Sequence, residues 1–231
     1  MIKFWSYDKE LVKYKKKIFT KIHKSLNRGQ IFFGKELLEF EKNFTRKYKS
    51  KYGVAVGSGT DALFIALKSL GVKKGDEVIT VANTAIPTIS AIRSTGAIPK
   101  LVDIGNDYLI DHSKIEKAIT KKTKAIVPVH LYGQTCEMNA IIKISKKYKL
   151  EIIEDCAQSQ GSKYRDKYCG TIGKIGCFSF YPTKILGAYG DGGFILTNDY
   201  KLYKKIKRIR FYGIETEDKN NQYFNKYYAN E

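Results

Sequence analysis

One lysine in the sequence, Lys184, lies between an apolar aromatic run and a glycine-rich loop, in the segment FYPTKILGAYGDGG at residues 180–193. Lysines are ordinarily solvated, but a lysine partly withdrawn from water can serve as a nucleophilic amine. The glycines after it allow the backbone to approach a ligand closely, because glycine adopts conformations that other residues avoid. A lysine in a surface turn would share part of this pattern, so the interpretation depends on other segments.

A carboxylate, Asp155, ends the apolar run in EIIEDCAQSQG, residues 151–161. A carboxylate at such a place is costly unless it is paired or close to solvent. A helix cap or a salt bridge would explain it, and so would an anion held against a cationic ring nitrogen or a metal. The metal is less favoured, because none of the histidines (His23, His112 and His130) lies in a motif with ligand spacing.

A third segment, VAVGSGTDAL, leads from an apolar run through Ser58, Gly59 and Thr60 into a helical pattern. A glycine-rich turn at a helix N-terminus offers free backbone N–H groups and the positive end of the helix dipole, which suits a phosphate group. A short capped turn has the same composition. The segment is not a Walker A loop, since no Gly-Lys-Ser/Thr follows, and it lacks the full dinucleotide fingerprint.

The elements that must position these segments alternate between short apolar runs and amphipathic stretches. This alternation predicts crossover units, a mainly parallel central sheet and helices on both faces, an α/β fold. The expected strands are 52–58, 76–83, 98–104, 124–132, 151–159, 176–181 and 192–198. The expected helices are 9–27, 34–48, 59–71, 86–95, 111–120, 137–148 and 199–213.

All three chemical segments fall at the carboxyl ends of expected strands, which is where such sheets bind their ligands. We therefore expect the segments to meet. A phosphate cradle, a buried carboxylate and a candidate Schiff-base lysine are the parts that hold pyridoxal 5'-phosphate.

The sequence also resembles a known family. GSGTDALFIAL, GDEVITVANTAIPT, AIVPVHLYGQ, IIEDCAQSQG and CFSFYPTKILGAYGDGGFILTND are similar to motifs of the DegT/DnrJ/EryC1/StrS sugar aminotransferases, over roughly residues 25–230. The resemblance implies fold type I, the fold of aspartate aminotransferase. It implies a nucleotide-linked keto-sugar as substrate, glutamate as the usual amino donor, and a homodimer.

The resemblance also assigns roles to residues. Lys184 would form the Schiff base with pyridoxal phosphate and then carry the proton between cofactor and substrate carbons. Asp155 would pair with the pyridinium nitrogen, and Gln158 would lie near the phenolic oxygen of the ring. The phosphate would be held by Ser58, Gly59, Thr60 and Ser179.

Two features depart from the family pattern. Many relatives place an aromatic side chain on the cofactor ring where this sequence has Ala85, so stacking there is weaker or supplied otherwise. The form NTAIPT resembles the branch that aminates 3-keto-6-deoxy sugars, such as a dTDP-linked hexose. Relatives continue beyond YYANE into a C-terminal small domain, so we expect an N-terminal helical segment (1–24) and a cofactor-binding large domain (25–231) without that small domain.

Composition limits the alternatives. The formal net charge of the 231-residue chain is +19, which raises nucleic acid as a partner. However, the basic residues are mostly lysines spread along the chain, whereas arginine suits bidentate phosphate and base contacts, so we expect no specific nucleic-acid binding. The cysteines form no CxxC pair and are expected to be reduced. The sequence has no bilayer-spanning run or signal-peptide core, which favours a cytoplasmic location and no membrane contact.

Three other functions stay open beside the aminotransferase. A dehydratase of the same family would use the same cofactor, but relatives of that type have histidine at the position of Lys184. A basic regulatory or nucleic-acid-binding protein would explain the charge, although no helix-turn-helix or RNA-binding motif supports it. An inactive truncated family member could bind the cofactor without turnover.

Overall fold

The chain is described by a computed structural model that covers residues 6–29, 32–216 and 227–229. It contains two compact units, Met1–Asn43 and Phe44–Glu231. Residues 1–5 of the expected N-terminal segment and the last two residues of YYANE lie outside the described residues. The predicted boundary after residue 24 stays a prediction.

The first unit contains α1 (Asp8–Asn27) and most of α2 (Lys35–Lys47). Both helices are amphipathic, as the spacing of their apolar residues predicts. Within the unit the Glu36 carboxylate forms an ion pair with Arg28 and accepts a hydrogen bond from Ser25 Oγ at 3.4 Å. These contacts connect the end of α1 to the start of α2.

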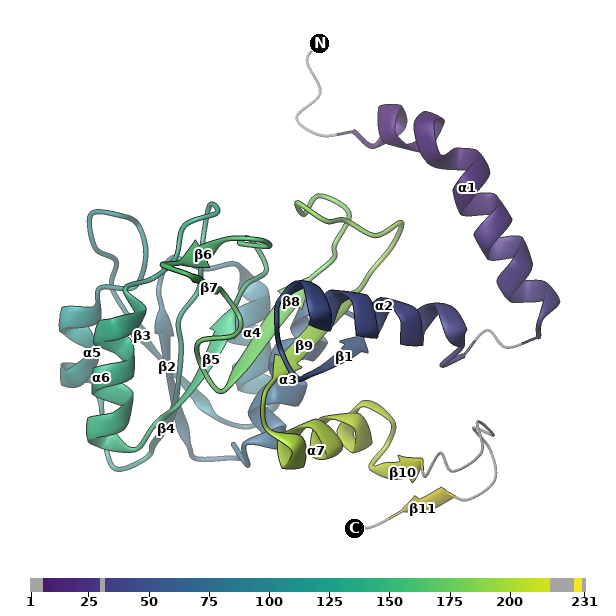
Figure 1. The fold of residues 1–231 in the computed structure, drawn as a ribbon. Helices are drawn as coiled ribbons and strands as arrows, with labels where there is room; N and C mark the ends of the chain where they lie inside the picture. Colours follow the sequence, from purple (N-terminus) through teal and green to yellow (C-terminus); the bar gives the residue numbers. More distant parts are fainter. Residues whose placement is uncertain (1–5, 30–31, 217–226, 230–231) are drawn as a thin grey trace. The chain divides into compact units, whose positions relative to one another are not determined.

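The second unit is built on a seven-stranded sheet with the strand order β1-β9-β8-β5-β4-β2-β3 (Figure 1). Only β9 runs against its neighbours, pairing antiparallel with β1 and β8, while the pairs from β8 through β3 are parallel. The mainly parallel sheet is therefore confirmed. The strands are β1 (Tyr52–Val56), β2 (Glu77–Val81), β3 (Ile98–Val102), β4 (Thr123–Val127), β5 (Glu151–Asp155), β8 (Ile175–Ser179) and β9 (Gly193–Thr197).

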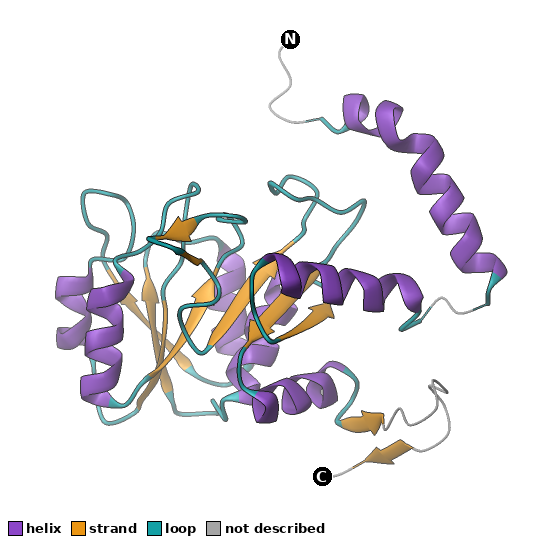
Figure 2. Ribbon diagram, viewed as in Figure 1, coloured by secondary structure: helices purple, strands orange, loops and turns teal. Residues whose placement is uncertain are grey.

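Helices cover both faces of this sheet, as Figure 2 shows. One buried cluster joins the sheet to α3 (Gly59–Ser69), α4 (Ile86–Ser94) and α7 (Tyr200–Arg210), and another joins it to α5 (His112–Ala118) and α6 (Met138–Tyr148). Successive side chains of a strand point to opposite faces, so Ile152 belongs to the second cluster and Ile153 to the first. This double burial explains why the central strands are almost continuously apolar.

On the face of the sheet that α5 and α6 cover, an aromatic cluster packs over the antiparallel strands. Phe44 and Tyr48 stack on each other with ring centroids 4.6 Å apart, and both contact Phe178 of β8. Phe44 also contacts Phe194 of β9 at 4.5 Å. These four rings are buried against β8 and β9, and we refer to them as the aromatic platform.

Two small two-stranded sheets were not expected. β6 (Lys163–Tyr164) pairs with β7 (Lys167–Tyr168), and β10 (Ile214–Thr216) pairs with β11 (Tyr227–Ala229). Strands this short leave no period-2 pattern to detect. Among the described helices, none has the length and apolar character needed to cross a bilayer.

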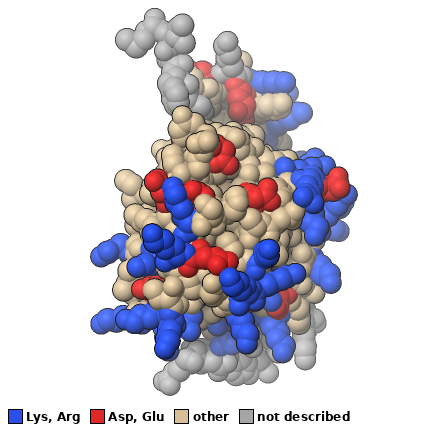
Figure 3. Space-filling model, turned by 90° about the vertical axis from the view of Figure 1, so that its left-hand side faces the viewer, with Lys and Arg blue, Asp and Glu red and all other residues tan. Residues whose placement is uncertain are grey.

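Basic side chains are dispersed over the surface. On the face drawn in Figure 3, lysines and arginines lie around the molecule with acidic residues between them. This distribution on the visible face resembles a solvated surface more than a continuous basic stripe.

Candidate active site

A cavity of about 280 Å³ opens at the carboxyl ends of the strands. All eight residues selected from the sequence line it: Ser58, Gly59, Thr60, Ala85, Asp155, Gln158, Ser179 and Lys184. They lie at or just after the carboxyl ends of β1, β2, β5 and β8, strands that point in one direction although they are far apart in sequence. The sheet topology thus brings the three chemical segments together, as expected.

The carboxylate of Asp155 forms the floor of the cavity and is almost fully buried, with 3% of the residue exposed. Its Oδ1 accepts the Ala157 N–H at 3.1 Å and its Oδ2 accepts the Thr88 hydroxyl at 2.8 Å. Burial raises the pKa of Asp155, and these two hydrogen bonds and the nearby Lys184 amine oppose that rise only in part. The carboxylate therefore lacks full compensation for its charge, which suits a site that receives a cation.

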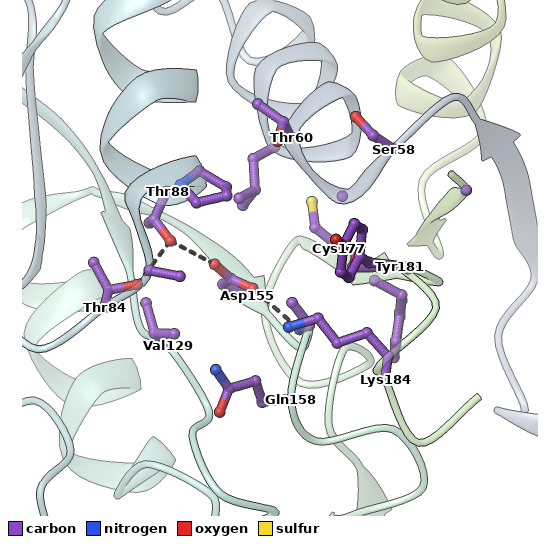
Figure 4. Close-up of a pocket in the computed structure, with 18 of the residues that line it drawn as sticks. Ser58, Thr60, Thr84, Thr88, Val129, Asp155, Gln158, Cys177, Tyr181 and Lys184 are labelled. Atoms are coloured by element: carbon purple, nitrogen blue, oxygen red, sulfur yellow. Dashed lines mark hydrogen bonds between the residues drawn. The ribbon is translucent and has the colours of Figure 1, made fainter. Parts of the chain in front are cut away.

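Lys184 enters the cavity from the opposite side. Figure 4 shows its side chain extending from the loop after β8 toward Asp155, with Gln158 beside them. The residue is partly buried, and its backbone N–H donates to the Tyr181 carbonyl at 2.8 Å, which closes a turn around it. The amine and the carboxylate thus face each other across one cavity, an arrangement that can hold a ligand between them.

The N-terminus of α3 forms a third wall. Ser58 is the N-cap, and its Oγ accepts the Asp61 N–H at 3.0 Å, so its own hydroxyl hydrogen remains to donate. The first intrahelical hydrogen bond of α3 starts at Ala62 N, so the N–H groups of Gly59 and Thr60 lie ahead of the helical ladder. These donors and the helix dipole can hold a phosphate group.

Two glycines allow the neighbouring strand ends to pack closely against the N-terminus of α3. A Cβ on Gly193 would lie 2.1 Å from the Ser58 carbonyl oxygen, and a Cβ on Gly59 would lie 2.6 Å from Ser179 Cβ. The start of β9 therefore packs against the backbone of Ser58, and the end of β8 packs against Gly59 at the helix N-terminus. Part of the glycine-rich pattern thus reflects contact within the protein and not only with a ligand.

Gln158 and Ala85 complete the predicted set. The Tyr132 N–H approaches Gln158 Oε1 at 3.5 Å, and the Gly133 N–H donates to the Gln158 carbonyl at 3.0 Å, which fixes the backbone of this residue. Ala85 caps α4 and lines the cavity with a methyl group. The roles given to these residues by the resemblance stay predictions.

Sequence reasoning missed Thr84 and Thr88. The hydroxyls of these two residues are 2.8 Å apart, and Thr88 in turn donates to Asp155, as the dashed lines of Figure 4 show. A threonine in a helical stretch is not conspicuous. Its position in the first turn after a parallel strand was the available clue, because that turn lies at the same edge of the sheet as Asp155.

A second buried polar cluster lies next to the cavity floor. His130, Glu154 and Cys156 have potential ligand atoms within 4.8 Å of one another. However, Glu154 Oε1 accepts the N–H groups of Ile172 and Gly173 at 2.7 and 2.6 Å, and its Oε2 contacts His130 Nε2 at 3.0 Å. The Gly170 N–H also donates to Oε2, at 2.8 Å. The carboxylate is saturated by protein donors, so we interpret the cluster as structural.

Comparison with known proteins places this geometry in context. Residues 12–231 match the sequence profile of the DegT/DnrJ/EryC1/StrS aminotransferase family. The dTDP-3-amino-3,4,6-trideoxy-alpha-D-glucose transaminase of Micromonospora megalomicea subsp. nigra is 43% identical over 212 residues, which are 91% of this chain and 57% of that protein. The chain therefore spans little more than half the length of this relative.

Solved structures agree. The crystal structure of DesV from S. venezuelae, in complex with a ketimine intermediate, superposes with a TM-score of 0.89 at 36% identity and covers 96% of this chain and 60% of DesV. NtdA from Bacillus subtilis, with bound PMP, has a TM-score of 0.84 at 37% identity and covers 93% of this chain and 48% of NtdA. The expected fold and, at the level of the family, the expected pyridoxal-phosphate cofactor are thereby confirmed. The chain belongs to the DegT/DnrJ/EryC1/StrS aminotransferase family.

Proposed function

We propose that the chain is a pyridoxal-phosphate-dependent aminotransferase that converts a nucleotide-linked keto-deoxysugar into its amino sugar, with glutamate as amino donor, for glycan biosynthesis. The observation that carries this proposal is that Lys184 faces the buried carboxylate of Asp155 within one cavity, with the N-terminus of α3 at its side.

The donor set fits the cofactor. A pyridoxal phosphate molecule presents an anionic phosphate, a ring nitrogen that can be protonated, and an aldehyde. The N-terminus of α3 with Ser58 suits the phosphate, and the buried carboxylate of Asp155 suits the protonated ring nitrogen. The amine of Lys184 suits the aldehyde. When bound, the cofactor ring accepts the electron pair of the substrate carbon.

The residues of this chain would divide the work. Asp155 would hold a proton on the ring nitrogen, and Thr88 would orient the carboxylate through its 2.8 Å hydrogen bond. Lys184 Nζ, freed when the donor amine takes its place, would move a proton at the substrate carbon. The apolar lining, which includes Val129 and Leu131, would limit water around the reacting atoms.

The finer parts of the proposal rest on similarity. A dTDP-linked substrate, which the NTAIPT form suggests, is supported by the name of the Micromonospora relative. Homodimeric assembly, a cytoplasmic location and the division into segments 1–24 and 25–231 belong to the same proposal. The lysine at position 184 favours transamination over dehydration.

Reductive trapping tests the proposal directly. The chain would be incubated with pyridoxal phosphate, reduced with borohydride and analysed by peptide mass spectrometry, and amino-sugar formation would be assayed with a dTDP-3-keto-6-deoxyhexose and glutamate. We expect one pyridoxyl-phosphate group on Lys184, and we expect Lys184→Ala to lose both the adduct and turnover. Lys146→Ala, which removes an exposed lysine of α6, is the matched control.

The outcomes separate the alternatives. An adduct on another residue with normal turnover in Lys184→Ala would contradict the assignment. Trapping at Lys184 without any turnover would favour the inactive family member, and loss of a hydroxyl group in place of amination would favour the dehydratase.

A further inference from the structure

The loop that carries Lys184 is weakly packed. It connects β8 to β9, and Figure 1 shows it rising beyond the ends of these strands. Its large side chains are mostly in solvent: Tyr181 is 53% exposed, Ile185 71% and Leu186 50%. Apolar burial therefore contributes little to the position of Lys184, which needs another source of order.

Gln160 supplies that order through its side-chain amide. The Leu186 N–H donates to Gln160 Oε1 at 2.5 Å, and Gln160 Nε2 donates to the Leu186 carbonyl at 3.3 Å. The same Nε2 donates to the Ser179 carbonyl at 2.5 Å. One amide thus pairs with both backbone groups of Leu186, as a neighbouring strand would, and joins them to the last residue of β8.

The segment on which Gln160 stands is anchored independently. The N–H of the next residue, Gly161, donates to the hydroxyl of Tyr48 at 2.9 Å, and Tyr48 belongs to the buried aromatic platform. On the other side, Ser162 N–H donates to the Ser159 carbonyl at 3.0 Å. The hydrogen bonds of Gln160 therefore connect an anchored segment, residues 159–162, to the exposed loop that carries Lys184.

This connection bears on the lysine. Leu186 lies two residues after Lys184, and the loop is tight there, because a Cβ on Gly187 would lie 2.3 Å from the Pro182 carbonyl oxygen. Gln160 also follows Asp155 and Gln158 in the same segment. A shift of the loop relative to this segment would move the amine relative to the carboxylate, and small misplacements are costly for reacting groups.

We propose that Gln160 is a positioning residue that holds the Lys184 loop against the Asp155 segment. It acts through the backbones of Leu186 and Ser179 and does not touch the reacting atoms. The proposal rests on the proposed function in so far as Lys184 is the reactive amine.

The test uses Gln160→Met, which keeps the length of the side chain and removes all three hydrogen bonds, and Gln160→Asn, which keeps the amide but shortens its reach. Gln134→Met makes the same change at an exposed glutamine and is the control. Amide hydrogen exchange would be measured without cofactor. Cofactor would then be added, and the absorbance of the Lys184–cofactor imine and the rate of its reduction by borohydride would be measured.

In both Gln160 variants we expect the Leu186 amide to exchange roughly tenfold faster, the effect of losing about one hydrogen bond, while amides in β5 keep their protection. With cofactor, we expect a smaller imine absorbance and a lower kcat with little change in KM. Gln160→Asn also keeps the proposal testable if Gln160→Met does not fold.

Unchanged Leu186 exchange and unchanged imine absorbance in a folded variant would overturn the proposal. The two proposals fail separately. Faster Leu186 exchange with no trapping at Lys184 in the unaltered chain would retain the loop contact and reject the proposed function. Trapping at Lys184 that is the same with and without the Gln160 amide would reject only the positioning role.

Discussion

At the scale of residues, the most informative group is the carboxylate of Asp155. It is buried, it has only two hydrogen-bond donors from neutral groups, and burial raises its pKa. A fold that keeps an ionised group under these conditions sacrifices stability at a functional site. The proposed pairing with a cationic ring nitrogen would relieve this imbalance.

This imbalance predicts the behaviour of Asp155→Asn. Because the folded-state pKa is raised, the ionised carboxylate lowers the free energy of unfolding near neutral pH, and this cost disappears as the pH falls below the ordinary Asp value of about 3.9. The cofactor-free variant should therefore be more stable than the unaltered chain at neutral pH and equal to it in acid. Turnover should fall roughly a hundred- to a thousandfold through loss of the electrostatic partner.

Urea unfolding over a pH series, without cofactor, measures this effect. Asp166→Asn, at an exposed aspartate in the β6–β7 turn, is the matched control and should show no such pH dependence. An Asp155→Asn protein that is less stable than the unaltered chain at neutral pH would show that the carboxylate is better compensated than its contacts indicate.

Residue types alone predicted the groups with distinctive chemistry. Lys184 and Asp155 were conspicuous because a lysine beside glycines and a carboxylate after an apolar run are unusual. Thr88 and Gln160 were not, because hydroxyl and amide side chains are common on surfaces and in turns. Their importance comes from what lies opposite them in the fold, at sequence separations that no local pattern encodes.

At the scale of elements, the N-terminus of α3 combines a helix cap with the proposed phosphate site, and these two roles can be tested separately. Ser58 caps the helix through its acceptor oxygen, and the same terminus is the proposed phosphate site. Ser58→Ala should lower the free energy of unfolding by about 1 kcal/mol through loss of the cap. Ser58→Asp should keep that stability, because it retains an acceptor and places a negative charge at the positive end of the helix dipole, yet it should repel phosphate.

Binding of pyridoxal phosphate and of phosphate-free pyridoxal would be compared by fluorescence for both variants. We expect Ser58→Asp to lose affinity mainly for the phosphorylated compound. If it binds both compounds as the unaltered chain does, the phosphate lies elsewhere in the cavity.

The segment after β7 gives a second prediction at this scale. Glu154 anchors this segment by accepting N–H groups from Gly170, Ile172 and Gly173, in addition to its contact with His130. The Cys136 N–H donates to His130 Nδ1 at 3.1 Å, so the ring proton lies on Nε2 and points at Glu154. Each carboxylate oxygen therefore faces two donors.

Glu154→Gln must place an NH₂ group against one of these donor pairs. We expect the free energy of unfolding to fall by about 2–4 kcal/mol, with faster amide exchange in residues 170–173, because buried donors lose their acceptor. Glu151→Gln, at the exposed start of the same strand, should leave the free energy of unfolding nearly unchanged. Retained stability in Glu154→Gln would indicate that this network adjusts or admits water.

The elements themselves were largely predictable, because buried parallel strands read as short apolar runs between amphipathic helices. Three features were not. The antiparallel insertion of β9 depends on its partners β1 and β8, which are distant in sequence. The order of the strands does not follow from their number, and the β6–β7 hairpin is too short to show periodicity.

At the scale of the whole molecule, the cavity and its support are continuous within one unit. The lining residues extend from Ser58 to Gly192, inside the unit that begins at Phe44. The chain nevertheless spans between 48% and 60% of the relatives described above. Cofactor trapping, which reports on the described cavity, and sugar turnover are therefore separate measurements.

The net charge of +19 leads to the last prediction. Lysines contribute most of it, and on the visible face of Figure 3 the basic groups are dispersed, with acidic groups among them. Such a surface attracts any polyanion through counterion release, and log K then falls with log salt at a slope of about −0.9 per phosphate neutralised.

We expect duplex DNA, followed by fluorescence anisotropy, to bind weakly at low salt and to lose nearly all affinity at physiological salt. A duplex of scrambled sequence should behave in the same way, because dispersed lysines do not read base edges. Tight binding at physiological salt that distinguishes the two duplexes would restore the regulatory alternative.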